Sequence, residues 1–161
     1  TLSCTVFSAP SFSLATSAAT SGLSIGVTYS WTTACPNVLF HRVMPGFVVQ
    51  GGGYTKDIEE KTLHDDIFNE SGNGLKNIKG SIAMARYEDP HSATRQFYFN
   101  MNNNTSLDPS PKNWGYTVFG TVVSGMEVLE AIADVETGYS EALDAEDVPL
   151  TPVLLIKAKV Q

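Results

Sequence analysis

The stretch FHRVMPGFVVQGGG, residues 40–53, decides which fold and which chemistry this chain can support. It places Arg42 within an apolar strand, followed by a Pro-Gly turn at residues 45–46, then Phe47, Gln50 and three glycines. A guanidinium stays charged at any ordinary pH, so burying it is costly unless it has a polar partner. The stretch therefore predicts a specific binding or catalytic site in which a cation lies beside an aromatic ring.

The composition is that of a globular, β-rich protein. A length of 161 residues with 42% hydrophobic side chains fits one domain, residues 1–161, with a single packed core. Thirteen glycines and eight prolines indicate many turns and favour strands over a helix bundle. A formal net charge of −7 argues against binding to nucleic acid or to anionic lipid. No apolar run approaches the roughly 20 residues that span a bilayer.

The first 39 residues differ from the rest of the chain. They contain no Asp, Glu, Lys, Arg or His, and 15 of them are Ser or Thr. Alternation from Leu23 to Trp31 has the period of a half-buried strand, and residues 2–6 suggest a second strand. The two cysteines, Cys4 and Cys35, fit no usual metal spacing and are compatible with two free thiols or with one disulfide.

Beyond residue 39 the pattern predicts short strands separated by turns. Strands are expected around the Pro-Gly turn at 43–49 and then at 80–86, 96–101, 114–123 and 153–160. Ser124 to Glu127 has the form of a capping box and opens a predicted helix that ends near Ala133. The asparagines at 100 and 102–104 are interpreted as turn residues. Many short strands with few helices indicate an antiparallel barrel or sandwich.

Other kinds of site find little support in the pattern. His41, His64 and His91 are separated by 23 and 27 residues, which matches no common metal-ligand spacing. There is no GxSxG turn for a hydrolase, and the triple glycine lacks the lysine of a phosphate loop. We therefore expect neither metal nor cofactor. What remains is Arg42, Phe47 and Gln50 with a second polar-aromatic run at 96–99, which suggests either a peptide-binding groove or an exterior with scattered aromatics.

Four motifs, in consistent order, resemble the cyclophilins, which are peptidyl-prolyl cis–trans isomerases. They are FHRVMPGFVVQGGG at 40–53, GSIAMAR at 80–86, SATRQFYF at 92–99 and WGYTVFG at 114–120. The resemblance covers about residues 37–160 and is strongest to the bacterial branch, whereas residues 1–36 do not match. It implies a mainly β fold, a closed eight-stranded antiparallel barrel capped by two helices.

The resemblance also implies a set of site residues. Arg42 matches the family's catalytic arginine, and Gln50 would orient it. Substrate-binding positions fall on Phe47, Val48, Met84, Ala85, Arg86, Gln96, Tyr98, Leu107 and Tyr116. Tyr98 replaces the phenylalanine usual in the proline pocket, so its hydroxyl needs a partner. Ser106 replaces the tryptophan of cyclosporin-sensitive members, so weak cyclosporin binding is expected.

The expected function is isomerisation of X–Pro bonds in polypeptides, assisting protein folding without a cofactor. The alternative is a chaperone or scaffold that binds proline-containing peptides with little turnover. Expected partners are proline-containing peptides and unfolded or folding proteins, and the expected state is a monomer. We expect a periplasmic location, with the cytoplasm as the alternative. The unusual segment 1–39 raises the hypothesis of a sequence-assignment error upstream of residue 37, which the intact mass of the protein tests.

Overall fold

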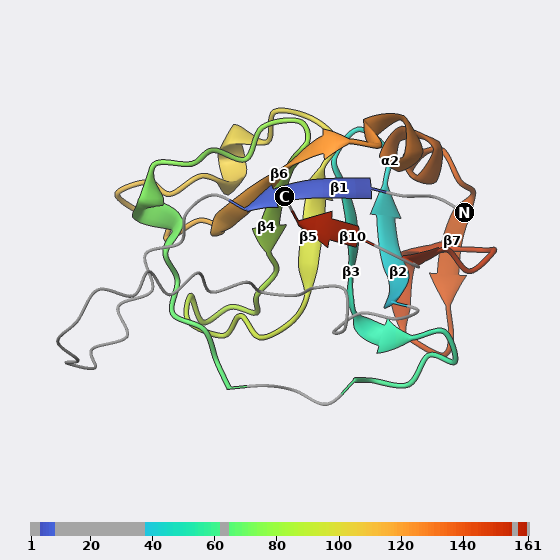
Figure 1. Ribbon diagram of the computed structural model, residues 1–161. Helices are drawn as coiled ribbons and strands as arrows, with labels where there is room; N and C mark the ends of the chain where they lie inside the picture. Colours follow the sequence, from blue (N-terminus) through green and yellow to red (C-terminus); the bar gives the residue numbers. More distant parts are fainter. Residues whose placement is uncertain (1–3, 9–37, 62–64, 156–157, 161) are drawn as a thin grey trace, which may run out of the picture.

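The computed structural model describes residues 4–8, 38–61, 65–155 and 158–160 (Figure 1). Its elements are β1 (Cys4–Ser8), β2 (Val38–Met44), β3 (Val48–Thr55), the 3₁₀ turn η1 (Ser71–Asn73), β4 (Ser81–Met84), β5 (Phe97–Asn100), η2 (Thr105–Leu107), β6 (Val118–Ser124), α2 (Met126–Ala133), β7 (Thr137–Ser140), β8 (Ala145–Pro149), β9 (Leu154–Leu155) and β10 (Ala158–Val160). Eight strands form one sheet in the order β10–β1–β6–β4–β5–β3–β2–β9, and β7 and β8 form a separate antiparallel hairpin.

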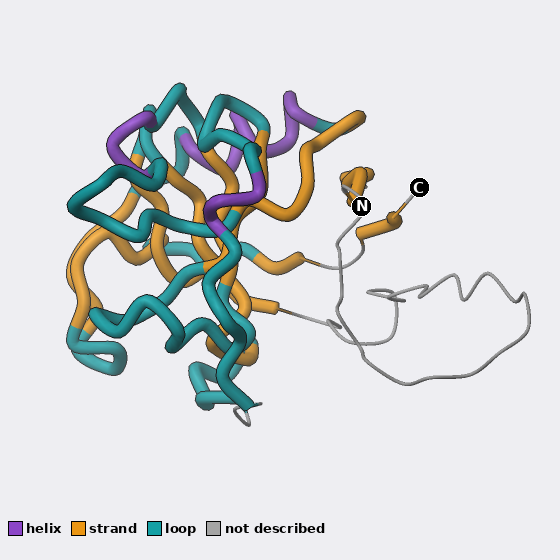
Figure 2. Tube along the Cα trace, turned by 90° about the vertical axis from the view of Figure 1, so that its left-hand side faces the viewer, coloured by secondary structure: helices purple, strands orange, loops and turns teal. Residues whose placement is uncertain are grey.

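The predicted closed barrel with two capping helices is wrong. Closing a barrel requires continuous strand pairing around the ring. The terminal stretch is instead divided between β9, which pairs with β2, and β10, which pairs with β1 in parallel, so the described sheet keeps two edges. Within the described ranges α2 is the one α-helix. The fold is mainly β, a curled half-barrel, and Figure 2 shows loops covering much of one side of the strands.

The strands predicted from the sequence correspond in part to the observed ones. The predictions at 80–86, 96–101 and 153–160 fall on β4, on β5 and on β9 with β10, and the prediction at 114–123 overlaps β6. The strand expected over residues 23–31 lies outside the described residues. None of the helices in the described ranges is long and apolar enough to cross a bilayer.

One face of the sheet packs into the main core beneath α2. Leu129, Ile132 and Ala133 of the helix are buried there, and Val128 packs against them. The strands contribute Val38, Phe40, Val43, Val49, Ile82, Phe97, Phe99 and Met101. The predicted capping box is wrong, because Ser124 ends β6 and the N-cap is Gly125, with φ of 92° and no side-chain cap. Figure 1 shows α2 close to β2.

A bulge in β2 turns Arg42 away from this core. Phe40 lies opposite Gly51 and Arg42 lies opposite Gln50, so two steps along β2 match one step along β3. An extra residue of this kind reverses the alternation of side chains. Phe40 and Val43 are both buried in the main core, while Arg42 is only half-buried.

The glycine run of β3 allows a close approach between two backbone segments. Gly52 has φ of +99°, a conformation that side chains rarely adopt. A Cβ atom at this position would lie 2.6 Å from the carbonyl oxygen of Arg95. The segment that precedes β5 can therefore pack tightly against β3 only because this residue is glycine.

The register of four strands gathers the predicted site residues on the second face. Arg42 pairs with Gln50, Gln50 with Tyr98, and Tyr98 with Ala83. Residues that oppose each other across antiparallel strands point to the same side of the sheet. Tyr98 and Ala83 belong to a second small apolar cluster, against which partly buried side chains pack; they are Phe47, Leu75, Ala85, Leu107 and Tyr116.

Candidate active site

A groove of about 490 Å³ opens on this second face. Its lining residues are Arg42, Phe47, Val48, Gln50, Ala85, Arg86, Tyr87, Ser92, Thr94, Gln96, Tyr98, Leu107 and Tyr116. The structure thus brings together all the site residues proposed from the sequence except Met84. It adds Tyr87, Ser92 and Thr94, which no motif singled out. We use the name proline pocket for its apolar end, formed by Phe47, Val48, Tyr98 and Leu107.

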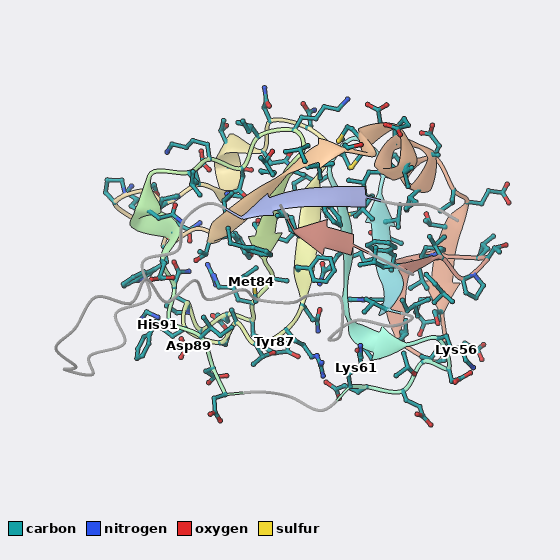
Figure 3. The ribbon with its side chains drawn as sticks, viewed as in Figure 1. Lys56, Lys61, Met84, Tyr87, Asp89 and His91 are labelled. Carbon is teal, nitrogen blue, oxygen red and sulfur yellow. The ribbon has the colours of Figure 1, made fainter. Side chains whose placement is uncertain are left out.

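Met84 lies at the end of β4 and does not line the groove. Its N–H donates to the carbonyl oxygen of Thr117 at 3.0 Å, and the N–H of Ala85 donates to that of Gln96 at 2.9 Å. These two donors are occupied within the fold, so a peptide strand would use other groups of the run 84–86. Figure 3 shows Met84 beside the loop that carries Tyr87.

The guanidinium of Arg42 is a permanently charged hydrogen-bond donor that lines the groove. Arg42 is half-buried, and within the described residues its side chain has no hydrogen bond or ion pair. Gln50 lies opposite Arg42 across the strand pair. Its Nε2 donates to Oε1 of Gln96 at 2.9 Å, so the Gln50 side chain is hydrogen-bonded to Gln96 and not to Arg42. A half-buried cation with free donors is strongly disposed to bind a polar group of a ligand.

His41 supports this row of polar side chains from the interior. Its ring is 9% exposed and meets the Tyr54 ring edge-on at 4.9 Å. Burial lowers the pKa of His41, because an imidazolium is poorly solvated there, and the nearby Arg42 acts in the same direction. Hydrogen bonds to Leu39 and Gln96 oppose the shift without reversing it. The ring is therefore neutral at ordinary pH.

We expect the unfolding free energy to fall as the pH is lowered below 6.5, the ordinary value for histidine. Unfolded His41 binds a proton near that pH, whereas folded His41 does so only at lower pH, so acid favours the unfolded state. The loss should extend down to the lowered pKa of the folded protein. Urea unfolding of wild type and His41→Gln between neutral and mildly acidic pH measures it. Equal pH dependence in the two proteins would contradict the assignment.

Tyr98 forms the floor of the proline pocket, and its hydroxyl has a partner. The side chain is buried, and its O–H donates to Oδ1 of Asn77 at 2.8 Å. Burial raises the pKa of Tyr98, with the neighbouring Tyr116 and Asp108 adding to the effect. The hydroxyl thus stays protonated and acts as a donor, which removes the energetic penalty of placing it beneath an apolar pocket.

Asn77 is the centre of a buried polar network beneath the pocket. It is 0% exposed, and its Nδ2 donates to the carbonyl oxygen of Leu107 at 3.2 Å and to Oδ1 of Asp108 at 3.1 Å. Its backbone N–H donates to the same Asp108 oxygen at 2.8 Å. The network therefore ties the floor residue Tyr98 to Leu107 in the wall of the pocket.

Two further asparagines extend the network to the rim. Nδ2 of Asn100 donates to Oδ1 of Asn77 at 3.1 Å, and Nδ2 of Asn104 donates to Oδ1 of Asn100 at 2.7 Å. Asn104 also donates to the carbonyl oxygen of Phe47 at 2.9 Å. Both side chains are buried. The interpretation as a turn residue is wrong for Asn100, which belongs to β5. Asn104 does open a turn, since its carbonyl oxygen accepts from the N–H of Leu107 at 2.9 Å, but its side chain belongs to the buried network. The position of Asn100 directly after the apolar run 97–99 was the sequence signal that could have revealed it.

These observations define a class of site: a groove on a curled sheet with an apolar pocket for a small ring and the guanidinium of Arg42, which is unpaired within the part of the chain that the structure describes. Within the described residues no group of His, Cys, Asp or Glu is arranged to hold a metal. The chain belongs to the cyclophilin-type peptidyl-prolyl cis–trans isomerases, because residues 26–160 match the family described as "Cyclophilin type peptidyl-prolyl cis-trans isomerase/CLD".

Several bacterial relatives carry the same family name. A peptidyl-prolyl cis–trans isomerase of Streptomyces antibioticus is 46% identical over 125 residues, covering 76% of this chain and 74% of the relative. Peptidyl-prolyl cis–trans isomerase B of Escherichia coli K12 is 45% identical over 122 residues, covering 74% and 73%. Isomerase A of Dickeya dadantii is 43% identical over 76% of this chain, a match that spans 63% of that relative's length.

Solved structures share the fold at lower identity. A cyclophilin-type isomerase of Cryptosporidium parvum superposes with a TM-score of 0.54 at 22% identity, covering 76% of this chain and 72% of the other. A second structure of that protein, obtained in the presence of the dipeptide Ala-Pro, gives a TM-score of 0.52 at 23% identity, covering 75% and 72%. These similarities support the cyclophilin-like half-barrel as the architecture of the chain.

Proposed function

We propose that this protein accelerates cis–trans isomerisation of X–Pro bonds in polypeptides, with the proline ring bound in the proline pocket. The observation that carries the proposal is the Arg42 guanidinium, which has no partner among the described residues and lines the same groove as Phe47 and Tyr98. The family membership and the bacterial relatives support the same activity.

Isomerisation demands little covalent chemistry from a site. Rotation about a peptide bond faces a barrier of roughly 18–20 kcal/mol because the amide is resonance-stabilised. No covalent bond has to break during this rotation. The site must only bind the twisted bond more tightly than either planar form. A pocket that holds the ring, a strand edge that holds the preceding residues and one well-placed donor are sufficient.

Arg42 would supply that donor. As the bond twists, the proline nitrogen loses conjugation and becomes a hydrogen-bond acceptor, and the guanidinium can donate to it or can steady the rotating carbonyl oxygen. Charged donors fixed in a partly dehydrated site need no reorganisation when the reaction occurs. Gln50 and Gln96, joined by their own hydrogen bond, would keep the surface around Arg42 fixed.

The run 84–86 would hold the residues that precede the proline. Its last two residues, Ala85 and Arg86, line the groove next to Tyr116, and the guanidinium carbon of Arg86 lies 4.5 Å from the centre of the Tyr116 ring. We also propose that cyclosporin binds weakly, because the exposed Ser106 has too small a side chain to cover a large cyclic peptide. The protein would act as a monomer.

The direct test is NMR exchange spectroscopy on a peptide such as Ala-Ala-Pro-Phe. We expect catalytic amounts of protein to speed exchange between the cis and trans signals, which without a catalyst takes tens to hundreds of seconds. Shifted peptide signals without faster exchange would contradict the isomerase and favour the alternative, a binding chaperone or scaffold. Boiled protein serves as the control for non-specific effects.

A further inference from the structure

The charged side chains that line the groove all carry the same sign. Arg42 and Arg86 are its charged lining residues, although the whole chain has a formal net charge of −7. The described residues include several carboxylates, but neither Arg42 nor Arg86 forms an ion pair with any of them, whereas Lys56, Lys76 and Lys79 do. The groove is therefore a cationic surface on an acidic protein, which favours an anionic ligand.

Arg86 is held in place by contacts that leave its charge uncompensated. Its Nε donates to the carbonyl oxygen of Gly115 at 3.1 Å. Its Nη1 donates to the carbonyl oxygens of Tyr87 at 2.8 Å and Glu88 at 3.2 Å. Carbonyl dipoles orient a guanidinium but carry no net charge. The side chain is thus a fixed cation whose attraction to a carboxylate is still available.

This cation lies close to the proline pocket. The Arg86 guanidinium carbon is 4.5 Å from the centre of the Tyr116 ring, and that ring meets the Tyr98 ring edge-on at 5.9 Å. The cation is therefore within about 10 Å of the pocket floor, which corresponds to roughly three residues of extended chain. A side chain one or two positions from a bound proline can reach it.

The carboxylates nearest to Arg86 in the sequence do not line the groove. Glu88 and Asp89 follow it in an exposed loop and are not lining residues of the groove. Figure 3 shows Asp89 with Tyr87 and His91 in that loop, beyond Met84. Asp108 accepts hydrogen bonds from Asn77 beneath the pocket and lies 3.7 Å from Lys76. A carboxylate in the groove would come from the substrate.

We propose that Arg86 makes the groove selective for substrates that carry a carboxylate one or two residues before the proline. The inference rests on the proposed function, since the run 84–86 is the edge assigned to the residues before the proline. Two unit charges a few ångströms apart at a wet surface attract modestly, and a lysine in the same place is repelled by a similar amount. The expected preference for Glu over Lys is about tenfold in kcat/KM.

The experiment compares Ala-Glu-Pro-Phe, Ala-Gln-Pro-Phe and Ala-Lys-Pro-Phe, and the same three residues placed one position earlier, at low and high ionic strength. Wild-type protein should isomerise the Glu peptide about tenfold faster than the Lys peptide in at least one of the two series at low salt, with the Gln peptide between them. High salt should bring the three rates together, because the charges are screened.

Three variants test whether Arg86 causes the preference for Glu over Lys. Arg86→Gln should reduce the Glu-to-Lys ratio to about twofold, the remainder coming from Arg42, while Arg86→Lys keeps the charge and most of the ratio. Lys56→Gln removes the same formal charge from an exposed position at the far end of β3, well away from Met84 and Tyr87 (Figure 3), and should keep the wild-type ratio.

Equal wild-type rates for the Glu and Lys peptides in both series would overturn this inference while leaving the isomerase intact. So would an unchanged ratio in Arg86→Gln protein with a native circular-dichroism spectrum. If Arg86→Gln fails to fold, two other results test the inference. A wild-type Glu-to-Lys ratio that does not change with salt, or an Arg86→Lys protein that loses the ratio, would overturn it. Failure to isomerise even the Gln peptides would overturn the proposed function instead.

Discussion

Replacing Arg42 by alanine should lower kcat/KM for X–Pro isomerisation about 100-fold, which corresponds to roughly 2.7 kcal/mol of lost transition-state stabilisation. Arg42 is the donor assigned to the twisted bond, so kcat should fall together with kcat/KM, and substrate binding should change little. The unfolding free energy should stay within about 0.5 kcal/mol, because the side chain makes no hydrogen bond or ion pair in the described structure. NMR exchange and urea unfolding measure the two quantities.

Two companion variants sharpen this result. Arg42→Lys keeps the charge but loses the planar fork of donors, so it should recover only part of the activity. Lys79→Gln, an exposed cation paired with Glu130 on α2, should keep the wild-type rate. A wild-type rate in folded Arg42→Ala protein would refute the role of Arg42, whichever way the lysine variant behaves.

The grouping of Arg42 with Phe47 and Gln50 in one site was predictable because these residues are close in the sequence. A Pro-Gly turn at residues 45–46 joins β2 to β3, and Gly46 takes the φ of 69° that such a turn needs. Phe47, Val48 and Gln50 follow within a few residues. Where a hairpin determines which residues are neighbours, sequence spacing is enough to bring a cation, an aromatic ring and an amide into one site.

The face on which Arg42 lies was not predictable from alternation. A regular strand would place Phe40 and Arg42 on the same side. The bulge between them reverses this. In the same region β3 packs tightly against the segment before β5, where a Cβ atom on Gly52 would lie 2.6 Å from the carbonyl oxygen of Arg95. The packing brings Gly52 against Arg95, more than forty positions later in the sequence, and a local sequence pattern cannot predict such a contact. The closed barrel was predicted wrongly for the same reason, because the pairing of β9 with β2 and of β10 with β1 is also between residues far apart in the sequence.

The asparagine network was missed because its composition is that of a turn. Asn100 and Asn104 belong to a run rich in asparagine, which is typical of loops. Their network depends on Asn77, more than twenty residues earlier, whose Oδ1 accepts from both the Asn100 amide and the Tyr98 hydroxyl. A polar residue is favourable in a core only when all its partners are present, and one sequence does not show where those partners meet.

Replacing Asn77 by alanine should therefore destabilise the protein by about 3 kcal/mol or more. The change removes the acceptor of the buried Tyr98 hydroxyl and one of the two acceptors of the Asn100 amide, and it leaves a cavity where the Asn77 side chain donated to the carbonyl oxygen of Leu107. A buried group left without a partner costs roughly 1–3 kcal/mol, and the lost hydrogen bonds add about 1 kcal/mol each. Relaxation and entering water recover part of this. Urea unfolding with an unchanged slope measures the loss.

A double-mutant cycle separates the network from simple loss of volume. Tyr98→Phe should cost about 1 kcal/mol alone, and less once Asn77 is alanine, because the hydroxyl then has no acceptor to lose. The exposed Asn102→Ala, two residues beyond Asn100 in the same run, is the matched control and should change stability by less than about 0.5 kcal/mol. If Asn77→Ala is as stable as Asn102→Ala, or if the two network substitutions add without coupling, the network does not hold the floor of the pocket.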